Sequence, residues 1–198
     1  MTLDKLPAFD DQGNLRMVVE SPKGSTVKVK SETTLPAFRV KRALPQGLAY
    51  PFDWGFIPGT VGADGDPVDA LVLHATATYP GVVTSCRALG IIDVTQKKPH
   101  GLVSNPRLIV VPTWYEMPDG ELGVLSPRFR REIESFFATA GYFAGSDTCM
   151  MTYEDGPANC GCAVCRRQEG ETEQASKTAL LASEPNYDEL QPLLRSSF

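Results

Sequence analysis

Apolar residues recur along this chain in short runs bounded by proline and glycine, a pattern typical of β-strands joined by turns. The sequence contains 16 prolines and 17 glycines, which break the chain often and suit short strands and loops. The pattern predicts strands near residues 15–20, 26–31, 37–42, 68–74, 82–95 and 107–112. Strands of this length and number indicate a small barrel.

Within the predicted strand that begins at Val68, side chains should point alternately to opposite faces. Val68, Ala70 and Val72 then form an apolar face, and Asp69 shares the other face with Leu71 and Leu73. We therefore expect Asp69 to lie at the mouth of a core.

One segment has a helical period. It begins at Ser126, has Pro127 at its first helical position and runs to about Ala140. Its apolar positions, expected in the core, are Phe129, Ile133, Phe136 and Phe137. Its polar face is expected to contact solvent or another subunit, and comprises Arg128, Arg130, Arg131, Glu132 and Glu134.

Length and composition fit one modest domain with a C-terminal addition. The chain has 198 residues, 42% of them hydrophobic, and no internal repeat. We expect a main domain over 1–145, including the helix, and a cysteine-bearing extension over 146–198 packed on it. A net charge of −5 argues against a general nucleic-acid surface. The first residues lack a signal-peptide pattern, and no apolar run is long enough for a membrane span, so a cytoplasmic protein is expected.

Three aspartates, Asp64, Asp66 and Asp69, lie within six residues. Carboxylate oxygens are the ligands that Mg²⁺ prefers, and Mg²⁺ usually takes one or two of them and leaves its other positions to water and substrate phosphate. Gly65 allows a tight turn between the first two aspartates, and Pro67 fixes φ before the strand begins. The same letters also suit an ordinary polar turn. The cluster thus indicates either a hard-cation site for phosphate chemistry or a loop.

The surroundings of this cluster resemble a known family. Tyr50-Pro51, the GFIP of residues 55–58 and the DGDPVD of residues 64–69 resemble the signature region of the soluble (family I) inorganic pyrophosphatases. ESPKGS at 20–25, PG at 80–81, CRALG at 86–90 and RLIVVP at 107–112 continue the resemblance, which covers about residues 15–140.

The resemblance implies an α+β fold, with a small closed five-stranded OB-like β-barrel and flanking helices. It also implies metal-dependent hydrolysis of pyrophosphate to two phosphates by a carboxylate-held, Mg²⁺-activated water. Bacterial members of the family usually form hexamers, so a homo-oligomer is expected by analogy.

The family's functional residues can be carried over by position. Asp64 and Asp69 would hold the activating Mg²⁺ ions, and Asp66 and Glu20 would be further Mg²⁺ ligands. Asp66 would also orient or deprotonate the attacking water. The residues expected to bind substrate are Lys28, Arg42, Trp54, Arg107 and Tyr142.

The chain also departs from the family pattern. Lys30, Gln96 and Asn105 stand where the family has acidic residues, and together they make the pocket about four charge units more positive. We therefore expect at most about two tightly held metal ions, with Lys30 replacing one. Trp54 replaces a tyrosine, and the family's paired tyrosine and lysine fall near Ala140 and Gly141, with Tyr142 one place away.

Four of the five cysteines, Cys149, Cys160, Cys162 and Cys165, lie within 17 residues. The family does not generally have this cluster. In a reducing compartment it suggests a tetrathiolate Zn²⁺ site, whereas a disulfide or redox role and unremarkable thiols are the alternatives. Cys86 lies in a predicted strand and is expected in the core.

Two further observations complete the picture. The two histidines, His74 and His100, lack partners at ligand spacing and are expected on the surface or in loops rather than in catalysis. Besides pyrophosphate hydrolysis, two other functions stay open: a catalytically impaired anion-binding or assembly module, and hydrolysis of another phosphoanhydride such as a nucleotide or short polyphosphate.

Overall fold

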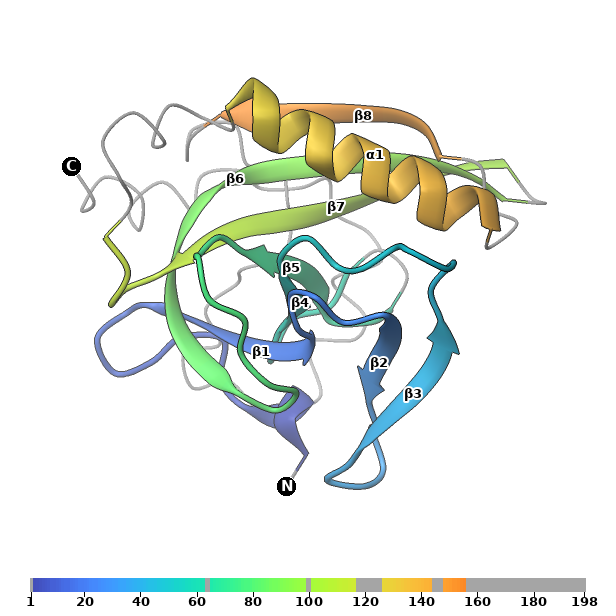
Figure 1. Ribbon diagram of the computed structural model, residues 1–198. Coiled ribbons are helices and arrows are strands. Elements are labelled where there is room, and N and C mark those ends of the chain that lie inside the picture. Colours follow the sequence, from blue (N-terminus) through green and yellow to red (C-terminus); the bar gives the residue numbers. More distant parts are fainter. Residues whose placement is uncertain (1, 63–64, 99–100, 117–125, 144–147, 156–198) are drawn as a thin grey trace.

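A computed structural model of the protein describes residues 2–62, 65–98, 101–116, 126–143 and 148–155 (Figure 1). A short 3-10 helix, η1, spans Leu3–Lys5, and one α-helix, α1, spans Pro127–Phe143. The strands are β1 Leu15–Ser21, β2 Val27–Ser31, β3 Phe38–Ala43, β4 Asp53–Ile57, β5 Val68–Val72, β6 Val83–Lys98, β7 Gly101–Pro112 and β8 Thr148–Asp155.

Five strands close into a ring. The main sheet has the order β1-β4-β5-β7-β6-β8, and β1 also pairs with β6. Closure depends on the 16-residue strand β6, whose first residues pair with β1 while nearly its whole length pairs with β7. The expected α+β fold with a small closed five-stranded OB-like arrangement is confirmed. β8 lies outside the ring and extends the sheet by pairing with the second half of β6.

The ring separates two hydrophobic cores. Alternation along β5 directs Ala70 and Val72 into the ring interior, where they meet residues such as Met17, Ile57 and Val110. Cys86 belongs to this core, as expected, and burial raises the pKa of its thiol to about 12. Leu71 points outward, into a second core beneath the helix. The face predicted to contain Asp69 and Leu71 is therefore the outer face of the ring.

Helix α1 lies across the outer face of the sheet, beside β8 (Figure 1). The backbone N–H of Phe129 donates to the Ser126 hydroxyl at 3.2 Å, which caps the helix where the sequence predicts its start. The predicted apolar stripe is buried against the outer-face residues of β5, β6 and β7. The expectation that this stripe belongs to the core is confirmed. None of the described helices is long and apolar enough to cross a membrane.

The β2–β3 hairpin forms a separate two-stranded sheet, anchored to the end of β1. The hydroxyl of Ser21 accepts a hydrogen bond from the N–H of Val29 at 2.9 Å and donates to the carbonyl of Val29 at 3.1 Å. Glu20 accepts hydrogen bonds from the N–H and hydroxyl of Ser31, at 2.8 and 2.9 Å. Lys28 and Lys30 are two residues apart in β2, so their side chains share one face of the hairpin, and both line the pocket described below.

Two strands were not among those predicted. β4 is buried at all five positions, so it has no alternation to reveal it, and only the motif around it marked the region. β8 lies in the part of the chain assigned to the C-terminal extension, yet it pairs with the main sheet. The rest of that extension lies outside the described residues, and its boundary stays a prediction.

His74 is buried in the loop that follows β5, so of the two expected positions the surface one is wrong and the loop one is confirmed. Its Nε2 lies 3.0 Å from Oδ2 of Asp53, which also accepts a hydrogen bond from the hydroxyl of Thr78 at 2.5 Å. Oδ1 of Asp53 accepts the backbone N–H of Lys23 at 2.7 Å. A buried carboxylate thus joins three segments at the start of β4. The sequence next to His74 did not reveal this partner, because Asp53 lies 21 residues away in the chain. His100 lies outside the described residues.

Gly55 is required by the close approach of β4 to β1. A Cβ on residue 55 would lie 1.8 Å from the carbonyl oxygen of Val18. We expect Gly55→Ala to lower the free energy of unfolding by about 4 kcal/mol. Gly47→Ala is the control, since nothing lies within 4 Å of its Cβ and only its φ of +83° opposes alanine, which should cost about 1–2 kcal/mol. Urea unfolding at an unchanged m-value measures both, and equal losses would contradict this account.

Candidate active site

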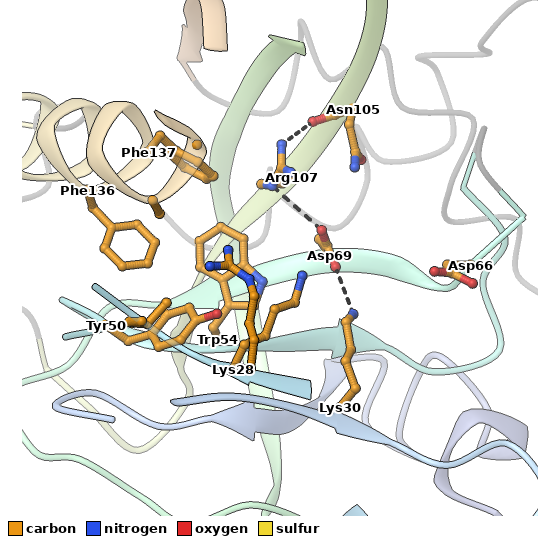
Figure 2. A pocket seen from close by; sticks show the side chains of 14 residues that line it. Lys28, Lys30, Tyr50, Trp54, Asp66, Asp69, Asn105, Arg107, Phe136 and Phe137 are labelled. Atoms are coloured by element: carbon orange, nitrogen blue, oxygen red, sulfur yellow. Dashed lines mark hydrogen bonds and ion pairs between the residues drawn. The ribbon is translucent and has the colours of Figure 1, made fainter. Parts of the chain in front are cut away.

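A polar pocket of about 330 Å³ opens between the outer face of the ring, the β2–β3 hairpin and helix α1 (Figure 2). Its described lining combines cations and carboxylates with an apolar wall from α1. The lining residues are Lys28, Lys30, Arg42, Leu44, Tyr50, Trp54, Asp66, Asp69, Asn105, Arg107, Phe136, Phe137, Ala140 and Gly141. Four of these side chains are cationic and two are acidic, so this part of the pocket attracts anions.

Lys28 and Arg42 stand opposite each other in the hairpin and face the pocket together. Burial lowers the pKa of Lys28, and the neighbouring cations Lys30, Arg42 and Arg107 lower it further against the opposing effect of Asp69. No ion pair of Lys28 is found among the described residues. An incoming phosphate would supply the counter-charge that Lys28 lacks.

Lys30 has the opposite environment. Its Nζ lies 3.0 Å from Oε2 of Glu20 and 3.6 Å from Oδ1 of Asp69 (Figure 2 shows the second contact). Burial alone would lower the pKa of Lys30, but attraction by Asp69 and Glu20 and the hydrogen bond to Glu20 outweigh it, so the pKa is raised. Lys30 is therefore a firmly charged ammonium that is already paired.

Arg107 is held in place from several sides. Its Nη1 donates to the carbonyl of Asn105 at 2.7 Å, and its Nε lies 3.6 Å from Oδ2 of Asp69. Its guanidinium lies over the rings of Trp54 and Phe137, at 5.7 and 4.9 Å from their centroids. The indole of Trp54 thus supports a cation in the pocket wall.

Most of the residues singled out from the sequence gather here. The pocket brings together Lys28, Arg42, Trp54, Asp66, Asp69 and Arg107, along with Lys30 and Asn105. Glu20 lies behind Lys30, and only 2% of its surface is exposed. Tyr142 is not in the described lining, and 74% of its surface is exposed, because the helix turns Ala140 and Gly141 toward the pocket instead.

Some predicted site residues cannot be placed. Asp64 lies outside the described residues, as do Cys160, Cys162 and Cys165. Gln96 and Cys149 lie in β6 and β8, but their side chains are not described. The Zn²⁺ site proposed for the cysteines accordingly stays a prediction.

Tyr50 belongs to the pocket but was not predicted as a site residue. Its ring packs 5.0 Å from that of Phe136, and burial raises the pKa of its hydroxyl, so the hydroxyl stays protonated and can donate. Its place at the start of the Tyr-Pro motif was the sequence feature that could have identified it as a site residue.

Phe136 and Phe137 have a double role, since they belong to the core and also line the pocket.

Comparison with known proteins agrees with this architecture. The family model "Inorganic pyrophosphatase" matches residues 17–156. An inorganic pyrophosphatase of Thermus thermophilus is 35% identical over 144 residues, which cover 69% of this chain and 78% of that protein. A Synechocystis inorganic pyrophosphatase is 35% identical over 94 residues, which cover 48% of this chain and 56% of that one. The chain therefore spans only about half the length of this relative and of several others that it matches.

Solved structures give the same result. The crystal structure of the Thermus thermophilus inorganic pyrophosphatase has a TM-score of 0.69 at 31% identity, and covers 77% of this chain and 89% of that one. The Coxiella burnetii inorganic pyrophosphatase has a TM-score of 0.64 at 27% identity, with 76% and 90% covered. The closed strand ring thus has the fold of the inorganic pyrophosphatases. The chain belongs to the inorganic pyrophosphatase family.

The family implies a divalent metal ion, and part of the pocket fits one. Asp66 and Asp69 present hard carboxylate oxygens to the cavity, as Mg²⁺ prefers. Within the described residues no three metal-ligating side chains of His, Cys, Asp or Glu form a group, and the third aspartate of the motif, Asp64, is not among them. Glu20 fits less well, because Ser31 and Lys30 already occupy its oxygens.

The pKa of Lys28 generates a test of its role. A lysine is charged below its pKa, so a lowered pKa means that Lys28 loses its charge at a lower pH than an ordinary lysine. As the pH rises through that range, affinity for phosphate should fall about tenfold. Lys28→Arg should remove this decline, because arginine keeps its charge.

Calorimetric titration with inorganic phosphate measures this affinity. The titrations run from about pH 7 to about pH 10.5, which spans the range up to the ordinary pKa of lysine. Lys41→Arg is the matched control, since Lys41 is exposed on the same hairpin and is absent from the described pocket lining. A Lys28→Arg profile that declines like the wild type would contradict the assignment.

Proposed function

We propose that this protein hydrolyses inorganic pyrophosphate to two phosphate ions with the help of bound Mg²⁺. The observation that carries the proposal is the pocket itself, in which Asp66 and Asp69 line the same cavity of about 330 Å³ as Lys28, Arg42 and Arg107. Membership of the inorganic pyrophosphatase family supports it. Carboxylates would hold the metal, and the cations would bind the phosphates.

The chain's own residues suggest a division of labour. Lys28 and Arg42 on the hairpin would bind the phosphate group nearest β2 and β3. Arg107 would bind and orient the other phosphate, because its guanidinium is held in place by the rings of Trp54 and Phe137. Positioning both ends of a substrate in this way supplies much of the rate in phosphoryl transfer.

Asp66 is proposed to accept the proton of the attacking water. It lines the pocket just before β5, beyond the lysine-paired Asp69 (Figure 2). A bound Mg²⁺ ion would lower the pKa of water and neutralise phosphate charge. Asp64, Asp66 and Asp69 are the residues proposed to hold it.

Phosphate release from pyrophosphate with Mg²⁺ tests the proposal. Wild type should release phosphate, and Asp66→Asn should lower kcat by about 10²–10⁴-fold if its carboxylate is the general base. Asp93→Asn is the control, since Asp93 of β6 accepts a hydrogen bond from Ser104 of β7 and is absent from the described pocket lining. Tripolyphosphate and ATP should be assayed in parallel. Phosphate release from tripolyphosphate or ATP but not from pyrophosphate would show that pyrophosphate is not the substrate. The absence of phosphate release from all three compounds would contradict a hydrolase function.

A catalytically impaired anion-binding module is the second candidate, favoured by the two protein cations that flank Asp69. Asn105 lies in the pocket lining, where an aspartate would add negative charge. We expect the double variant Gln96→Asp/Asn105→Asp to raise the rate of pyrophosphate hydrolysis at least about tenfold by strengthening metal binding. An unchanged low rate would favour the binding module, and Gln96→Asn/Asn105→Gln controls for substitution without added charge.

A cytoplasmic location and a homo-oligomer belong to the same proposal. Both follow from the family rather than from a contact in this chain. Light scattering of the purified protein would measure the oligomer.

A further inference from the structure

The side of the pocket next to the hairpin contains an ammonium between two carboxylates from different strands. Lys30 of β2 lies 3.0 Å from Glu20 of β1 and 3.6 Å from Asp69 of β5. Glu20 is almost fully buried, and its other oxygen accepts two hydrogen bonds from Ser31. A buried carboxylate beside a second carboxylate needs a cation nearby, and here the chain supplies it.

The second oxygen of Asp69 is also directed toward a protein cation. Oδ2 lies 3.6 Å from Nε of Arg107, while Lys30 lies at the same distance from Oδ1 (Figure 2). Arg107 cannot easily withdraw, because the Asn105 carbonyl and two aromatic rings hold its guanidinium. Asp69 therefore bridges two positive charges of the protein, and a divalent ion placed on its Lys30 side would meet the ammonium.

Charge decides what else can bind here. A metal ion placed between Glu20 and Asp69 would occupy the position of the Lys30 ammonium, and repulsion between the two would oppose it. Burial of Glu20 keeps solvent from screening that repulsion. On the other side of Asp69, Asp66 lines the same pocket from the turn that precedes β5 (Figure 2).

We propose that Lys30 is a built-in cation that takes the place of a divalent metal ion between Glu20 and Asp69, so that metal ions bind only on the Asp66 side of the pocket. The inference rests on the proposed function and refines it. Glu20 then orients Lys30 and does not ligate metal in the wild type, which revises the role expected for it from the sequence.

Counting bound Mn²⁺ tests this without any substrate. Electron paramagnetic resonance reports the free Mn²⁺ in a titration, and the bound ions per chain follow. Lys30→Glu, which removes the ammonium and adds a carboxylate, should bind one more Mn²⁺ per chain than the wild type. Lys30→Arg, which keeps the charge, should bind the same number as the wild type.

Lys41→Glu is the matched control, because it makes the same charge change on the same hairpin at a position exposed to solvent. It should leave the count unchanged. An unchanged count in Lys30→Glu, or an equal gain in Lys41→Glu, would overturn the proposal. A Glu20→Gln variant that binds fewer Mn²⁺ ions than the wild type would also overturn it, since Glu20 would then be a metal ligand.

Thermal unfolding guards against a folding defect. Lys30→Glu and the milder Lys30→Gln should have a lower Tm than the wild type without metal, and Mn²⁺ should restore it more than it raises the wild-type Tm. A variant that stays unfolded at every Mn²⁺ concentration would count against the proposal, because an added ion should compensate Glu20 as the ammonium does. The count is read without pyrophosphate, so an inactive protein that gains an ion in Lys30→Glu would overturn the proposed function and leave this inference standing.

Discussion

The hydrogen-bonded closure of five strands is the constraint on which the rest of this structure depends. β6 achieves it by pairing with β1 at its beginning and with β7 along most of its length. Once the ring is closed, each strand has one face inside and one outside, and no residue can change faces without shifting the register of the whole strand. The inner faces form a continuous apolar core.

The outer face of the ring divides between packing and chemistry. Toward α1 it contains Leu71, Ile92 and Ile109, which the helix covers. At the neighbouring position in β5 it contains Asp69, which the helix leaves open to the pocket. Stability and site thus share one surface, and Phe137 shows this directly, since its ring packs in the core and supports the guanidinium of Arg107.

Charge balance distinguishes this pocket from a plain cluster of carboxylates. Lys28 and Lys30 are two residues apart on one strand, yet burial and neighbouring cations lower the pKa of Lys28 while Asp69 and Glu20 raise that of Lys30. One lysine is available to an incoming anion, and the other neutralises acids of the chain itself. Lys30, at a position where the resemblance predicts an acidic residue, thus belongs to an internal salt-bridge network with Glu20 and Asp69.

The sequence by itself determined the local features: alternation placed Asp69 and Leu71 on one face of β5, and the 3.6-residue period placed the phenylalanines of α1 in the core. The resemblance to a known family, carried over by position, also identified most of the pocket residues. Only the tertiary structure decided which distant groups meet. It buried His74 against Asp53, turned Tyr142 away from the pocket, and placed Lys30 between Glu20 and Asp69. These outcomes depend on pairing between strands far apart in the chain, which a local pattern does not encode, and the wholly buried β4 offered no alternation to read.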